Sequence, residues 1–388
     1  MKNTLLPLIF LLAFTKAGAQ FSKRTIRVGL FTSLYLDQSF TDSGKLKSPK
    51  DFPRQASAGL EFYEGASMAI DSLNNNGISV KMSVFDIQSA SGNINLLLQN
   101  GEIEKLDMMI AQTSGNEINQ LALISREFKI PFINATHPND RGIRESPQVY
   151  IANPTINSHI EFLQQQISNK WPNANIMWFR RADPLDNRIQ EVFQSANERN
   201  SAKKLKYKTF ALPEKFTQAD LFAHFDTTKT NIVIAGSLDD KFATEFLNTV
   251  REFSKKGLLV VVGMPNWETL REIQLSKYAA LPIYYSSAFF ITPGNAWAKE
   301  MEAVFKKNIY IKPSLSVYKG FELTFYFTSI FSKHGRIIVG DSTDVLFTPL
   351  NDLDFKPIKI KGPEGTIDYF ENKKLYFLRR LNGLTLNQ

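Results

Sequence analysis

The residues best suited to bind a ligand stand where an expected strand runs into an expected helix. Gln112-Thr113-Ser114-Gly115 follows the apolar segment 108–111 and precedes a helix that we expect to begin at Asn116. The hydroxyl groups of Thr113 and Ser114, together with the free N–H groups of a helix start, can bind an anion. The same residue types also cap helices for local reasons, and on residue types alone capping is the simpler explanation.

Recognisable catalytic and metal-binding motifs are absent from the sequence. It contains no Gly-x-Gly-x-x-Gly, Walker loop, His-Glu-x-x-His or Gly-x-Ser-x-Gly pattern. Because there is no cysteine, thiolate catalysis, cysteine zinc sites and disulfides are excluded. None of the four histidines stands at metal-ligand spacing: His137, His159, His224 and His334. We therefore predict no catalytic residues, no metal, no cofactor and no enzymatic activity.

Strand and helix patterns alternate along most of the chain, in two successive sets. In the first set we expect strands at 25–31, 80–86, 108–111 and 131–134 and helices at 58–74, 93–103 and 116–128. In the second set we expect strands at 175–179, 206–210, 231–235 and 258–262 and helices at 156–168, 186–199, 217–224 and 239–255. Continuous apolar strands such as 258–262 fit a parallel sheet covered on both faces. The predicted fold class is α/β, with two doubly wound, Rossmann-like lobes.

The last hundred residues do not begin a third set. We expect long helices at 295–307 and 318–333, and a β-hairpin formed by 365–370 and 374–378. These pieces would complete the lobes, so that lobe 1 comprises 24–153 plus about 287–345 and lobe 2 comprises 154–286 plus about 346–388. The aromatic residues of helix 318–333 could form a box for an aromatic ligand, but spacings of three and four favour core packing.

The N-terminal segment has the features of a secretory signal. Lys2 is followed by ten non-polar residues, Leu5 to Phe14, and then by Ala17-Gly18-Ala19, which predicts cleavage after Ala19. Ten residues are too few to span a bilayer, and no later stretch is long and apolar enough. Cleavage would remove two lysines and no acid, lowering the net charge from +8 to a scattered +6. We predict a soluble periplasmic protein without a lipid anchor, membrane insertion or nucleic-acid binding.

Several segments, taken in order, resemble the type I periplasmic binding proteins, the leucine/isoleucine/valine-binding family of ABC-importer receptors. Their order and spacing carry the resemblance over about residues 25–165. The segments are Glu61-Phe62-Tyr63-Glu64-Gly65-Ala66, Val84-Phe85-Asp86-Ile87-Gln88-Ser89, Ile110-Ala111-Gln112-Thr113-Ser114-Gly115, Lys129-Ile130-Pro131-Phe132-Ile133-Asn134-Ala135 and Asn153-Pro154-Thr155, with Tyr318-Lys319-Gly320-Phe321-Glu322 looking like the family's late helix start.

The resemblance implies two lobes joined by a three-crossing hinge that close on a small ligand. The loop matching Thr113, Ser114 and Gly115 would hold a ligand carboxylate, and the loop matching Asn134-Ala135-Thr136 would add backbone and hydroxyl contacts. On the second lobe the family uses an acidic residue and aromatic side chains. The positions that correspond here are Ser237, Asp239 and Trp267, with Glu268 as the alternative to Asp239.

The predicted function is that of a secreted solute-binding protein. It would capture a small polar ligand, an amino acid or a related molecule, between its lobes for an ABC permease. The alternative is a non-transport binding module that regulates an envelope protein or a cell-wall partner, as in activators of peptidoglycan synthases or sensory receptor domains. Fold class alone does not separate these functions.

Overall fold

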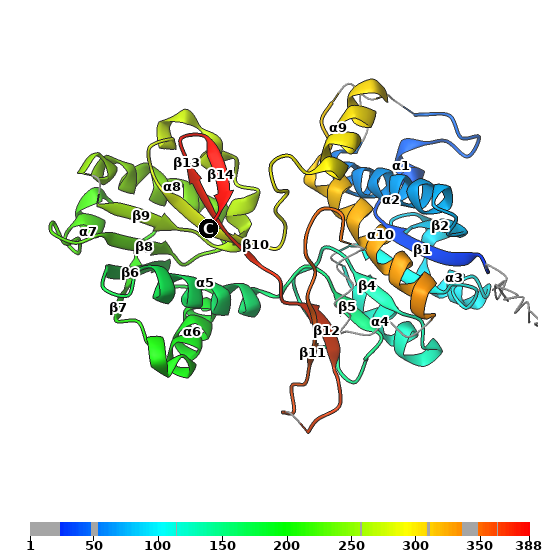
Figure 1. The fold of residues 1–388 in the computed structure, drawn as a ribbon, viewed down its shortest axis with the longest axis horizontal. Helices are drawn as coiled ribbons and strands as arrows, with labels where there is room; N and C mark the ends of the chain where they lie inside the picture. Colours follow the sequence, from blue (N-terminus) through cyan, green and yellow to red (C-terminus); the bar gives the residue numbers. More distant parts are fainter. Residues whose placement is uncertain are drawn as a thin grey trace, which may run out of the picture.

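Two lobes lie side by side in the structure, each built on its own seven-stranded sheet (Figure 1). The computed structural model describes residues 24–47, 53–113, 115–256, 258–308, 311–335, 348–362 and 364–388. The predicted signal peptide, residues 1–19, lies outside the described residues. The two-lobed α/β fold expected from the alternating pattern is confirmed.

The sheet of lobe 1 has the strand order β11-β12-β5-β4-β3-β1-β2. All pairs are parallel except β11 with β12. One face is covered by α2 and α10 and the other by α3 and α4. The strands are β1 (Ile26–Thr32), β2 (Val80–Asp86), β3 (Met108–Gln112), β4 (Phe132–Asn134), β5 (Val149–Ile151), β11 (Phe355–Ile358) and β12 (Tyr369–Asn372), and the helices α1 (Leu36–Ser39), α2 (Ser57–Asn75), α3 (Ile94–Gln99), α4 (Glu117–Phe128), α9 (Ala296–Asn308) and α10 (Leu315–His334).

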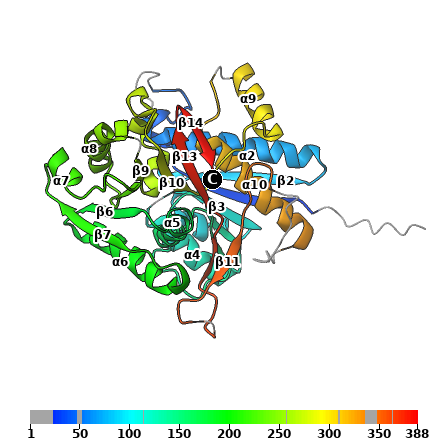
Figure 2. The same ribbon diagram turned by 60° about the vertical axis from the view of Figure 1, so that its left-hand side comes forward.

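The sheet of lobe 2 has the strand order β14-β13-β10-β9-β8-β6-β7. The strands from β6 to β10 pair in parallel, and β13 and β14 add an antiparallel edge (Figure 2). Helices α5 and α6 cover one face, and α7 and α8 cover the other. The strands are β6 (Asn175–Arg181), β7 (Tyr207–Leu212), β8 (Asn231–Ala235), β9 (Leu259–Val262), β10 (Ile283–Ser287), β13 (Tyr376–Leu381) and β14 (Leu384–Asn387), and the helices α5 (Ile156–Lys170), α6 (Pro184–Arg199), α7 (Gln218–Phe222) and α8 (Asp240–Val250).

The chain passes between the two sheets three times, after β5, after β10 and after β12. The last passage corrects two expectations. Strands β11 and β12 belong to the sheet of lobe 1, so the assignment of 346–388 to lobe 2 holds only for β13 and β14. The expected hairpin also does not form, because β12 pairs in parallel with β5 while β13 pairs with β10 of the other lobe. Residues 373–375 are therefore a crossing between lobes and not a turn.

Helix α10 packs closely along α2, and its aromatic residues are core. A Cβ atom at Gly65 would overlap the carbonyl oxygen of Val317, and one at Gly320 would overlap that of Phe62, so both glycines permit the close approach. Phe327 contacts the Tyr150 ring edge to face, with 5.4 Å between centroids. Core packing, and not an aromatic ligand box, accounts for these rings. Among the described residues no helix is long and apolar enough to cross a membrane.

Candidate functional site

A cavity of about 380 Å³ lies where the two lobes meet beside the first crossing. Its walls come from the loops after β4, β5, β8 and β9, from the first turn of α5 and from the first two turns of α10. Ligands of doubly wound sheets bind at these carboxyl ends of strands. Lobe 1 and the crossing contribute Pro138, Asn153, Leu315 and Lys319, and lobe 2 contributes Ile156, His159, Leu238, Pro265, Asn266, Glu268 and Thr269.

Lys319 brings a positive charge to this cavity from lobe 1. It lies in the second turn of α10 and is half-buried, between the buried residues Tyr318 and Gly320. Its ammonium group lies 5.9 Å from the centroid of the Phe289 ring. Within the described part of the chain it makes no hydrogen bond and no ion pair. An anion in the cavity would supply the counter-charge that this ammonium group lacks among the described residues.

His159, on α5, is buried beside Lys319 and is uncharged. Its Nδ1 atom lies 2.8 Å from the Ser286 hydroxyl oxygen, at the end of β10. Burial, with a smaller contribution from the positive charge of Lys319, lowers the pKa of His159 to about 3. The imidazole is therefore neutral at physiological pH. It offers a neutral hydrogen-bonding group to the cavity and no second positive charge.

Glu268 places a carboxylate on the lobe 2 side of the same cavity. Its Oε1 atom accepts a hydrogen bond of 2.5 Å from the Ser287 hydroxyl, which in turn accepts one of 2.9 Å from the N–H of Phe289. No ion pair joins Glu268 to Lys319 in the residues that the structure describes. The cavity thus presents one positive and one negative group, each carried by a different lobe.

The polar residues expected on lobe 1 do not line this cavity, and those described bind their own loops. Thr113 is buried, and its hydroxyl accepts the N–H of Gly115 at 3.4 Å. The Asn134 side chain forms a local turn, accepting the N–H of His137 at 3.2 Å and donating to its carbonyl at 3.0 Å. Ala135 is buried, Thr136 is half-buried, and the Thr136 carbonyl accepts from the Asn153 side chain. Ser114 lies outside the described residues.

The three residues expected on lobe 2 flank the cavity without lining it. Asp239 is the exposed N-cap of α8, where its carboxylate accepts the N–H of Lys241 at 2.7 Å. Ser237 is buried and accepts the N–H of Asp239 at 3.2 Å. Trp267 is fully buried, and its ring fills the space beside Gly263. Trp267 is therefore part of the lobe 2 core, and Glu268, the alternative acid, is the residue that faces the cavity.

Apart from Glu268, the sequence did not indicate the polar residues that line the cavity: Asn153, His159, Asn266, Thr269 and Lys319. A signal for Lys319 existed, since it interrupts an otherwise buried stretch at the start of an aromatic helix. His159 lies in the first turn of a helix that follows a crossing between the lobes, and this position is a second such signal. Asn153 belongs to a segment that carries the resemblance, and nothing else in the sequence marks it as a lining residue.

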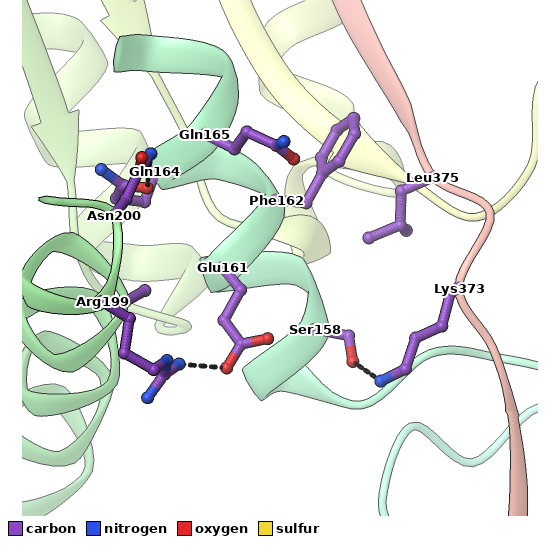
Figure 3. A pocket seen from close by; sticks show the side chains of 10 residues that line it. Ser158, Glu161, Phe162, Gln164, Gln165, Arg199, Asn200, Lys373 and Leu375 are labelled. Carbon is purple, nitrogen blue, oxygen red and sulfur yellow. Dashed lines mark hydrogen bonds and ion pairs between the residues drawn. The ribbon is translucent and has the colours of Figure 1, made fainter. Parts of the chain in front are cut away.

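A second cavity, of about 430 Å³, lies on the flank of lobe 2 between α5, α6 and the crossing 373–375 (Figure 3). Its charged groups are already paired: Arg199 contacts Glu161 at 2.5 Å, and Lys373 donates to the Ser158 hydroxyl at 2.6 Å. None of the described residues that line it belongs to the body of lobe 1. The cavity beside Lys319 is the stronger candidate, because it spans both lobes and leaves charged groups for a ligand.

Comparison with solved structures identifies the class of fold. Chains of ABC-transporter substrate-binding proteins superpose on nearly the whole chain at low sequence identity, and the chain has the fold of the type I periplasmic binding proteins. No protein-family model and no curated protein matches the sequence.

Three of these structures show the degree of similarity. A branched-chain amino acid ABC transporter periplasmic ligand-binding protein from Burkholderia xenovorans has a TM-score of 0.61 and 11% identity, covering 92% of this chain and 91% of its own. The branched-chain amino acid substrate-binding protein LivJ from Streptococcus pneumoniae, in complex with isoleucine, has a TM-score of 0.53 and 14% identity, covering 94% and 100%. A solute-binding protein from R. palustris in complex with benzoate has a TM-score of 0.50 and 15% identity, covering 94% and 95%.

Proposed function

We propose that this protein is a secreted solute-binding protein that captures a small polar ligand, an amino acid or a related molecule, between its lobes. The observation that carries the proposal is the cavity beside the first crossing, which both lobes line and which holds an unpaired ammonium and a carboxylate. Hinged two-lobed proteins close around ligands at such a place. Two proteins of the same fold hold isoleucine and benzoate in their solved structures, which supports a small organic ligand.

A thermal-shift screen of amino acids, organic acids, sugars and short peptides tests ligand capture. A ligand that binds only the folded protein raises its melting temperature by mass action, by an amount that grows with ligand concentration. Leu315→Trp fills the cavity and should abolish the shift. Ile311→Trp is the matched control, because Ile311 is 59% exposed and does not line the cavity. A broad screen without any shift, or a shift that survives Leu315→Trp, contradicts the proposal.

The transport role needs a partner test. We propose that this protein, located in the periplasm, delivers its bound ligand to an ABC permease. Affinity capture with the ligand-saturated protein should recover permease subunits and should recover fewer without ligand. Recovery of a peptidoglycan-synthesis or other envelope protein, independent of ligand, would favour the regulatory alternative. Export itself is tested by N-terminal sequencing of the mature protein, for which we expect Gln20 as the first residue.

A further inference from the structure

Lobe 1 carries a third cavity, of about 430 Å³, between the C-terminal half of α2 and the helix α9, with Phe321 of α10 below them (Figure 1). No described residue lines both this cavity and the one beside the first crossing. We propose that it binds a small organic amine, whose ammonium group lies beside the Trp297 ring and between the carboxylates of Asp71 and Glu300. This second site goes beyond the proposed function and does not depend on it.

Trp297, on α9, forms the aromatic wall of the cavity. Its ring packs against Phe321 and Phe325, with 5.7 and 5.4 Å between the ring centroids. These contacts hold the indole in place, and it remains only half-buried because part of it borders the cavity. Among aromatic side chains, an indole attracts an ammonium group most strongly. Trp297 therefore favours a cation as the occupant.

Two carboxylates line the same cavity from two different helices. Asp71 belongs to α2 and Glu300 to α9, and both are exposed. Neither makes a hydrogen bond or an ion pair within the part of the chain that the structure describes. The lysines of α9, Lys299, Lys306 and Lys307, do not line the cavity. The described lining residues thus carry two negative and no positive charges, and an ammonium group would gain charge-assisted hydrogen bonds without displacing an existing partner.

The remaining walls suit the body of an organic amine. Met68, Met301 and Val304 line the cavity, and Val304 is 38% exposed although it is apolar. Methionine side chains adapt to apolar bodies of irregular shape, and burying hydrocarbon against them is favourable. Ser72 and Asn75 offer oxygen acceptors for further ammonium N–H groups. The volume lies within the range of small-molecule sites, about 300–1,000 Å³.

Calorimetric titration of the full mature chain tests the charge requirement with three probes that share one body. They are 2-phenylethylamine, a cation, 2-phenylethanol, which is neutral, and 3-phenylpropionate, an anion. We expect the amine to bind at least about tenfold more tightly than the alcohol, and added salt to weaken the amine because exposed carboxylates are screened. Equal affinity for the amine and the alcohol, or no binding of the amine, would overturn the inference.

The fluorescence of Trp297 reports on this site. Of the four tryptophans, Trp178 and Trp267 are fully buried in lobe 2, and Trp171 lies at the end of α5 in the same lobe. An amine bound on lobe 1 should therefore change the emission of Trp297. Trp297→Phe should lose that change and keep most of the affinity, while Trp297→Leu should weaken the amine about 3- to 30-fold. An emission change that persists in Trp297→Phe would place the amine elsewhere and overturn the inference.

Carboxylate variants separate recognition from folding. The double variant Asp71→Asn/Glu300→Gln changes two exposed side chains, so it should melt close to the wild type and bind the amine about tenfold more weakly. Glu127→Gln is the matched control, because it removes an exposed carboxylate of α4 that does not line the cavity, and the affinity should stay unchanged. Wild-type affinity of the double variant for the amine would overturn the inference.

Leu315→Trp separates this site from the cavity beside the first crossing, which Leu315 lines. The variant should bind the amine as tightly as the wild type. Loss of the amine in Leu315→Trp, together with its retention in the double carboxylate variant, would assign the amine to the cavity between the lobes; it would overturn the inference and leave the proposed function standing. Amine binding at Trp297 in a protein that captures no ligand between its lobes would support the inference and overturn the proposed function.

Discussion

The loops at the strand ends and the cavity at the crossing differ in how their polar groups are satisfied. Thr113, Asn134 and Asp239 accept or exchange hydrogen bonds with backbone within three residues of themselves. Lys319, in the cavity, has no such partner in the described chain, and Glu268 has one short contact to Ser287. Both regions carry polar side chains, so residue type alone does not distinguish them. The difference teaches that a polar group indicates a ligand only when the local backbone does not already use it.

Trp267→Ala should have the largest effect and tests whether Trp267 belongs to the core. Its ring is fully buried in lobe 2, so truncation should lower the free energy of unfolding by about 3–5 kcal/mol. Denaturant unfolding measures that loss. The milder Trp267→Phe should leave ligand affinity unchanged after correction for the unfolded fraction. A Trp267→Phe protein with wild-type stability and weakened binding would return Trp267 to the ligand site.

Glu322 is the opposite of Glu268, because the hydrogen bonds to its carboxylate come from other groups of this chain and leave none for a ligand. It is buried in α10 and accepts hydrogen bonds from the N–H of Leu350 and the side chain of Asn351, which in turn accepts the N–H of Phe290 after β10. Burial raises the pKa of Glu322 from 4.5 to about 8, against the opposing effect of these donors.

The sign of the pH effect follows from that shift. A folded-state pKa above the unfolded value means that stability is fully present below about 4.5 and is lost as the pH rises through about 8. The loss is on the order of 1.4 kcal/mol per pH unit within this window. Melting curves of the wild type should fall with pH relative to Glu322→Gln, which cannot ionise. A wild-type curve that rises relative to Glu322→Gln would contradict the assignment.

Asp239 and Glu268 form a direct pair for comparison, since both were candidates for the acid of lobe 2. Asp239→Ala removes an N-cap and should cost about 1 kcal/mol of stability without changing ligand affinity. Glu268→Gln keeps its size and should weaken ligand binding while stability changes little. Unfolding and titration of both variants measure the two effects. The reverse pattern would make Asp239 the ligand contact.

The sequence predicted the elements well because their periodicity is local. The strands at 80–86 and 231–235 were predicted with the bounds that the structure has. Which strands pair with each other is not a local property, and this explains why the hairpin predicted at 365–378 is wrong. Nothing within those residues shows that β12 pairs with β5, more than two hundred residues earlier, while β13 pairs with β10.

The candidate site was predicted less completely than the fold. The loops after β4, β8 and β9 were predicted to face a ligand, and each contributes a wall of the cavity. Pro138 and Leu238 are neighbours of the residues named, and Glu268 is the alternative acid itself. Which side chain in a loop faces outward depends on caps and turns that consume the others. Lys319 depends on how α10 lies against α2, which is a matter of packing between segments far apart in sequence.

Gly115→Ala should have the smallest effect and sharpens the comparison most directly. A Cβ atom at Gly115 would overlap the Glu117 carboxylate, the end of a flexible side chain that can turn away, so stability should change by less than about 0.5 kcal/mol. Because Gly115 does not line the cavity, the affinity for any ligand should also stay within about twofold. Denaturant unfolding measures the stability, and ligand titration measures the affinity. A Gly115→Ala protein that folds normally and loses binding would show that the loop after β3 holds the ligand, as the resemblance implied, and that the cavity beside the first crossing does not.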